Sequence, residues 1–103
     1  MNTEVVLRAC GIEVTADDES SARSHLREDG LEFRGSWDYE LVDSNPTDEE
    51  VGDDDAHRLE VDAEDPGGRG ERTWTGDVTF TVIVEGEHDE DEAFRLAREA
   101  LAR

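Results

Sequence analysis

The chain has 103 residues, with 30 Asp and Glu against 10 Lys and Arg, and a formal net charge of -20. This length fits one domain, residues 1–103, with a single modest hydrophobic core. The charge argues against binding to nucleic acid, whose phosphates require a basic surface. No run reaches the roughly 18 apolar residues of a membrane span. The single Cys10 excludes a disulfide within the chain.

The acidic residues are spread evenly along the chain, and all ten basic residues other than His are Arg. Such a composition is typical of a chain that works in molar salt, because at about 1 M ionic strength the Debye length falls to about 3 Å and repulsion between acids is screened. We interpret the charge as an adaptation to solvent. The dense acids also suggest a DNA mimic, which is a hypothesis in addition to the two functions described below, an interaction module and a small-molecule or anion binder. The N-terminal residues lack the pattern of a secretion signal, so we expect a cytoplasmic protein.

A first strand is predicted over residues 5–14, where two apolar clusters flank a bend at Cys10–Gly11. A helix is predicted over about 17–28, because Thr15 precedes a run of acids as in a capping box. Gly30 stands where helices commonly end, so we expect the helix to stop there.

Residues 31–42 alternate strictly between apolar and polar side chains, which predicts one long strand with one face on the core. Gly35 is expected to be a bulge or a point of close approach. An acidic loop over about 43–56 follows and is expected to be mobile. A short strand is predicted over 59–63, and the turn residues of 65–70 then reverse the chain.

The strongest strand signal begins at Trp74 and continues to Glu85. A terminal helix is predicted after Asp89, which has the spacing of a cap to Glu92, and apolar residues at helical spacing extend it to Leu101. The order strand, helix, three strands, helix predicts an α+β two-layer sandwich, with a mainly antiparallel four-stranded sheet and two helices on one face. The strand face expected inside carries Trp74, Gly76, Val78, Phe80, Val82 and Val84.

Patterns for metal or nucleophilic chemistry are weak. Asp53–Asp55 with His57 offers oxygen and imidazole ligands, but the spacing does not match a calcium-binding loop and a solvated loop explains it. The remaining histidines, His25 and His88, could join Cys10 in a site only if the fold brings them together. We therefore predict no metal, no cofactor and no catalytic residue, and we favour a non-enzymatic role.

The segment 67–74 differs from its acidic surroundings. It carries Arg69, Arg72 and Trp74 on a glycine-rich backbone. Guanidinium groups bind phosphate or carboxylate, and an exposed indole can stack on a ring, so these three residues are a candidate small-molecule or anion site. The structural alternative is a hairpin loop with Trp74 in the core and the arginines paired to neighbouring acids.

The opposite face of the strongest strand carries a stripe of low charge, formed by Thr75, Thr79, Thr81 and Ile83. Stripes of this kind can mark a surface used for self-association, although Thr and Ile are also ordinary strand residues. The stripe leads us to predict a self-associating interaction module, a homodimer with no nucleic-acid or membrane partner. The alternative is the small-molecule or anion binder described above.

The absence of Lys, together with the run from Val82 to Ala93, resembles small acidic haloarchaeal proteins of unknown function. The resemblance implies a cytoplasmic archaeal protein and transfers no site residues.

Overall fold

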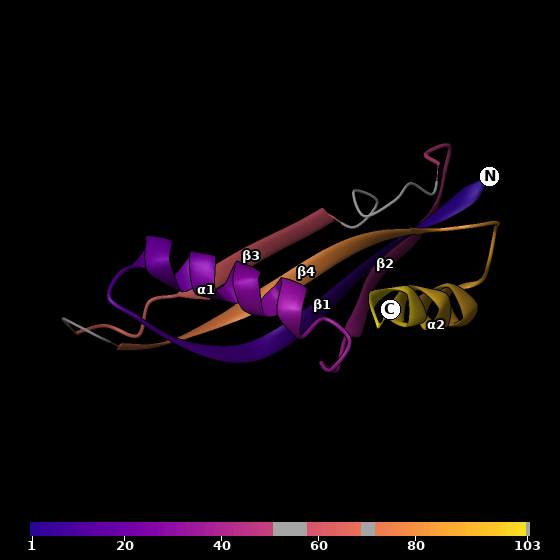
Figure 1. Cartoon of the computed structure of the whole chain (residues 1–103). Helices are drawn as coiled ribbons and strands as arrows, with labels where there is room; N and C mark the ends of the chain where they lie inside the picture. Colours follow the sequence, from indigo (N-terminus) through magenta and orange to yellow (C-terminus); the bar gives the residue numbers. More distant parts are fainter. Residues whose placement is uncertain (51–57, 69–71, 103) are drawn as a thin grey trace.

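The computed structural model describes residues 1–50, 58–68 and 72–102. It contains an α+β fold with the predicted order strand, helix, three strands, helix (Figure 1). The elements are β1 (Asn2–Ala16), α1 (Glu19–Glu32), β2 (Glu40–Thr47), β3 (Arg58–Glu64), β4 (Arg72–Val84) and α2 (Glu90–Leu101).

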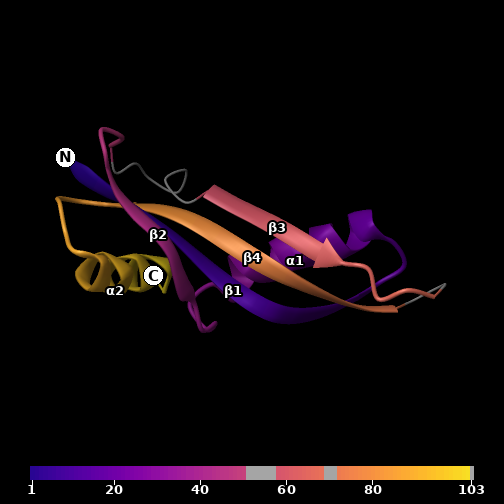
Figure 2. The ribbon, with the colours of Figure 1, turned by 180° about the vertical axis from the view of Figure 1, so that it is seen from behind.

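The strands form one antiparallel sheet in the order β2-β1-β4-β3 (Figure 2). The long strands β1 and β4 pair along the middle, from Thr3 opposite Val84 to Ala16 opposite Arg72. Their register shifts between Ala9 and Ile12, where Gly11 has a φ of 72°. A positive φ is readily adopted by glycine, so the sequence places the irregularity here and the predicted bend in β1 is confirmed.

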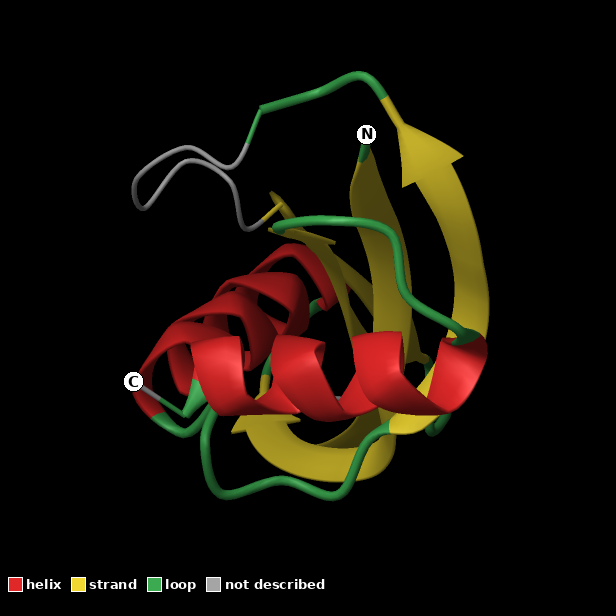
Figure 3. Cartoon of the chain, turned by 90° about the vertical axis from the view of Figure 1, so that its right-hand side faces the viewer, coloured by secondary structure: helices red, strands yellow, loops and turns green. Residues whose placement is uncertain are grey.

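Both helices cover the same face of the sheet, as predicted (Figure 3). Helix α1 packs on β1, β3 and β4, whereas α2 packs on β1, β2 and β4. Alternation along β4 places its predicted inner residues in the core. One continuous apolar core therefore lies between the sheet and the helices, with Trp74, Phe80, Leu7, Leu26 and Leu101 as its largest fully buried side chains.

Helix α1 is capped by Asp18, whose carboxylate accepts a hydrogen bond from the Ser21 backbone N–H at 2.8 Å. The predicted stop at Gly30 is wrong, because the helix continues to Glu32. Gly30 is buried inside the helix, and a Cβ there would lie 3.1 Å from Val78 Cγ1. Its small size serves close packing on the sheet rather than helix termination.

The long strand predicted over 31–42 is also wrong. Leu31 lies on α1 and Phe33 lies in the turn that follows. Their exposed fractions are 56% for Leu31 and 45% for Phe33. Strand β2 begins only at Glu40. The alternation arises because Trp37, Tyr39 and Leu41 pack partly against the core from a turn and the start of a strand. Gly35 does make a close approach: a Cβ there would lie 2.9 Å from the Ala102 Cα.

The acidic loop expected over 43–56 begins later than predicted, since β2 extends to Thr47. Residues 51–57, including Asp53–Asp55 and His57, lie outside the described residues. Strands β3 and β4 and helix α2 confirm the remaining elements, and Asp89 caps α2 by accepting a hydrogen bond from the Glu92 N–H at 2.9 Å. Neither described helix is long and apolar enough to cross a membrane.

Candidate functional site

The sheet has a second face, here called the outer face, which neither helix covers (Figure 3). Partners across an antiparallel pair point to the same side of the sheet. Val6 is opposite Thr81, and Arg8 is opposite Thr79. These four residues are all partly buried and form what we call the central patch, near the middle of the β1–β4 pair.

Acidic side chains border the central patch on both sides. On β3, Glu60 is opposite Thr79 and Asp62 is opposite Asp77. On β2, Glu40 is opposite Arg8. The outer face thus has a centre of low charge between two acidic margins. Its acids are Glu4, Glu13, Glu40, Asp43, Glu60, Asp62, Glu64 and Asp77.

The predicted stripe on β4 is only partly exposed. Thr75 is exposed, and Thr79 and Thr81 are partly buried. The expectation that Ile83 is exposed is wrong, because only 4% of its surface is accessible. It shares a hollow with Leu96 of α2, at the end of β4 that extends past the pairing with β3. The stripe therefore ends at Thr81.

The sequence pattern does not predict that Val6 and Arg8 belong to the candidate surface. The run Val5–Leu7 signals a strand with an apolar residue on each face, since Val5 and Leu7 are buried and Val6 points the other way. Which β4 residues lie beside Val6 and Arg8 depends on the register of two distant strands, and the sequence shows no sign of that register.

Trp74 and Arg72 have structural contacts. Trp74 is 2% exposed, and its indole N–H donates to the Ala16 carbonyl at 3.0 Å. Arg72 lies over the Trp74 ring at 4.8 Å, and its guanidinium pairs with Asp65 at 3.1 Å. The Trp74 ring is therefore not accessible for stacking on a ligand. Arg69 lies outside the described residues.

Cys10 is exposed on the outer face, with its Sγ 3.5 Å from Glu40 Oε1. Desolvation, followed by the nearby charges of Asp77 and Glu40, raises the pKa of its thiol above the ordinary value. A raised pKa leaves less thiolate, which is the nucleophilic form. The environment of Cys10 therefore makes it less reactive than an ordinary surface cysteine.

The described histidines do not join Cys10. His88 Nε2 lies 2.8 Å from the Glu85 carbonyl at the turn before α2, and His25 is exposed on α1. Within residues 1–50, 58–68 and 72–102, no group of three or more His, Cys, Asp or Glu is placed to hold a metal ion.

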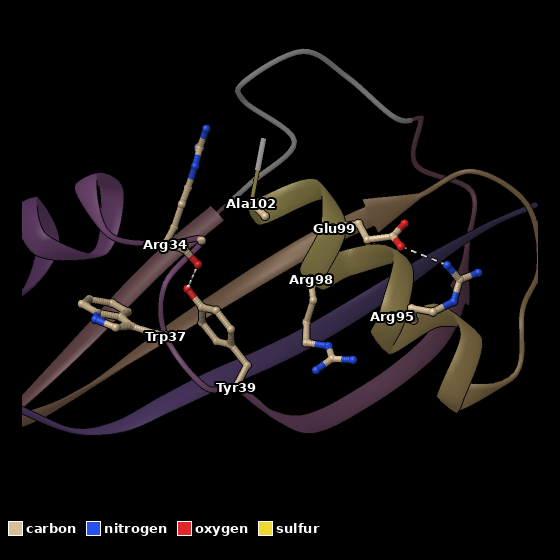
Figure 4. A pocket seen from close by; sticks show the side chains of 8 residues that line it. Arg34, Trp37, Tyr39, Arg95, Arg98, Glu99 and Ala102 are labelled. Atoms are coloured by element: carbon tan, nitrogen blue, oxygen red, sulfur yellow. Dashed lines mark hydrogen bonds and ion pairs between the residues drawn. The ribbon is translucent and has the colours of Figure 1, made fainter.

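A cleft of about 320 Å³ lies between the turn after α1 and the C-terminal half of α2 (Figure 4). Two aromatic residues and three arginines are among the residues that line it, in this otherwise acidic chain. The sequence pattern does not predict this grouping, because the residues come from two segments that only the fold brings together. The lining residues are Arg34, Gly35, Trp37, Tyr39, Arg95, Arg98, Glu99 and Ala102.

Comparison of the chain with protein-family models, with curated proteins and with solved structures finds no match. The outer face and the cleft are therefore the two candidate functional surfaces of the described residues.

Proposed function

We propose that this protein is a non-enzymatic interaction module that forms a homodimer through the outer face of its sheet. The observation that carries the proposal is the uncovered face, with its central patch of Val6, Arg8, Thr79 and Thr81. The proposal includes adaptation to molar salt in an archaeal cytoplasm, on the grounds of the charge of -20 and the complete replacement of Lys by Arg.

The area of the outer face is suitable for a dimer. With about 3.3 Å per residue and about 4.8 Å between strands, the four strands span roughly 700 Å². A stable interface of standard size uses about 800 Å² of each partner. Two twisted sheets can pack face to face with their strands about 30° apart. The face is thus large enough for one second copy.

The charges favour a symmetric arrangement in high salt. Around a twofold axis the same patch meets itself, so two central patches would meet and Arg8 would lie near acids of the other copy. The acidic margins repel one another, but they would form the solvated rim of the interface, where molar salt screens charges beyond a Debye length of about 3 Å. We therefore expect dimerisation to strengthen as the salt concentration rises.

The proposal is tested by adding charge at the centre of the face. The variant Thr79→Glu/Thr81→Glu places two carboxylates in the central patch. Its matched control, Ser20→Glu/Ser24→Glu, makes the same change in charge at exposed positions of α1, which lies on the other side of the sheet. Circular dichroism establishes that both variants are folded.

Sedimentation equilibrium in molar KCl should give a dimer for the wild-type chain and for the α1 control, and a monomer for the central-patch variant. We expect the dissociation constant to rise at least tenfold in the central-patch variant, since burial of two unpaired charges costs more than about 1.4 kcal/mol. Equal dissociation constants for the two variants would contradict the proposal.

A further inference from the structure

The cleft between the turn and α2 combines features of a ligand site. We propose that it binds a small aromatic carboxylate, with the ring between Trp37 and Tyr39 and the carboxylate at Arg98. This site lies on the helix side of the sheet, so it is independent of the proposed dimer face.

Tyr39 provides a fixed aromatic surface. Its ring packs edge-on against Phe80 in the core, with ring centres 6.0 Å apart, and its hydroxyl donates to the Arg34 carbonyl at 2.7 Å (Figure 4). Burial raises the pKa of Tyr39 to about 12. Like an ordinary tyrosine, its phenol is neutral at physiological pH and does not repel an anion. Trp37, from the same turn, adds a second partly exposed ring.

Arg98 is the guanidinium that is open to a ligand. Arg95 is committed to two carboxylates, pairing with Glu99 at 3.0 Å and more closely with Glu92. This pairing also partly offsets the charge of Glu99, the acid that lines the cleft. Arg98 lies 4.6 Å from the Phe94 ring centre, and no ion pair within the described residues involves it. Its charge is therefore available to a ligand carboxylate.

The walls of the cleft are held together by a tight contact. Gly35 lies so close to Ala102 that a Cβ at Gly35 would be 2.9 Å from the Ala102 Cα. This contact fixes the turn that carries Trp37 and Tyr39 against the end of α2. The two walls are thus positioned before any ligand arrives, which lowers the entropy cost of binding.

The surroundings favour an aromatic carboxylate over a simple inorganic anion. The carbonyl end of a helix carries partial negative charge, so the end of α2 opposes anions in general. In molar salt, chloride would also compete for a single guanidinium. A planar carboxylate matches the guanidinium fork, and a ring adds stacking that salt does not screen. The volume of about 320 Å³ lies at the lower end of the range for small-molecule sites.

Benzoate is the probe for this proposal, and benzamide is its neutral counterpart. Titration in molar KCl, followed by the indole N–H signals in two-dimensional NMR, should shift the Trp37 signal and leave that of the buried Trp74 unchanged. Assignment of the two signals comes from a Trp37→Phe variant. Benzoate should bind at least tenfold more tightly than benzamide, because hydrogen bonds to a charged group are about twice as strong as neutral ones.

The test of residue roles compares Arg98→Gln with Arg23→Gln. Arg23 is an exposed guanidinium on α1, so its replacement makes the same change in charge away from the cleft. We expect Arg98→Gln to raise the dissociation constant for benzoate at least tenfold and Arg23→Gln to leave that constant unchanged. Three results would each overturn the proposal: benzoate and benzamide bind equally, the two variants bind benzoate equally, or benzoate does not shift the Trp37 indole signal.

Discussion

Gly76 of β4 lies directly against Leu26 of α1, and a Cβ at Gly76 would stand 2.4 Å from Leu26 Cδ1. The same Cβ would stand 2.4 Å from the Asp62 carbonyl oxygen of β3. The missing side chain thus lets α1 approach the sheet at the point where β3 pairs with β4. This contact helps to seat α1 on the inner face of the sheet.

Replacement of Gly76 by Ala should destabilise the fold by about 1–3 kcal/mol or more, because the backbone of β3 must shift to make room. Chemical unfolding in molar KCl measures the effect. Gly30→Ala is the matched comparison. Its new Cβ would meet the Val78 side chain at 3.1 Å, and Ala is favoured over Gly in a helix by about 0.5–1 kcal/mol, so we expect a net change near zero. Equal losses for the two variants would contradict the proposed contact.

Cys10 should react slowly with a disulfide reagent, because desolvation and the charges of Asp77 and Glu40 raise the pKa of its thiol. The rate should increase with pH and reach half of its maximum above the ordinary thiol pKa. At fixed pH, Asp77→Asn should increase the rate severalfold, since removal of a nearby negative charge lowers the thiol pKa.

Glu28→Gln on α1 is the control for charge and should leave the rate unchanged. The measurement is made at low protein concentration, where association does not shield the outer face. A Cys10 that titrates below the ordinary thiol pKa would contradict this account of its environment.

Stability should increase with salt, because the net charge of -20 repels itself within the folded chain. Relief of about 1 kcal/mol of repulsion raises the melting temperature of a domain of this size by about 4–8 °C. We therefore expect the melting temperature to rise by several degrees between dilute buffer and molar KCl. Identical melting curves at both salt concentrations would contradict the interpretation of the charge.

The sequence predicts β4 well because nearly every position alternates and all the inner residues except Gly76 are large and apolar. It fails over residues 31–42, where the same alternation arises from a helix end, a turn and the start of β2. Local pattern does not distinguish these cases. Gly30 shows a related limit, because only the packed structure reveals that it serves close approach to Val78 rather than a helix stop.

The candidate surfaces also combine residues that the local sequence pattern predicts with residues that only the fold brings together. Thr79 and Thr81 are found from the alternation within one strand, whereas Val6 becomes their neighbour only through the register of β1 and β4. Burial of Trp74 agrees with its expected place on the inner strand face and removes the accessible ring that the candidate ligand site beside Arg72 requires. The cleft joins residues 34–39 to residues 95–102, and the sequence contains no sign of that juxtaposition.

The central claim is that the outer face forms a homodimer, and the mass of the native chain in molar KCl tests it most directly. Light scattering after size exclusion should give twice the chain mass of 11.5 kDa. A mass of 11.5 kDa at high protein concentration in molar KCl would contradict the claim. The central patch would then be an ordinary solvent-facing part of the sheet.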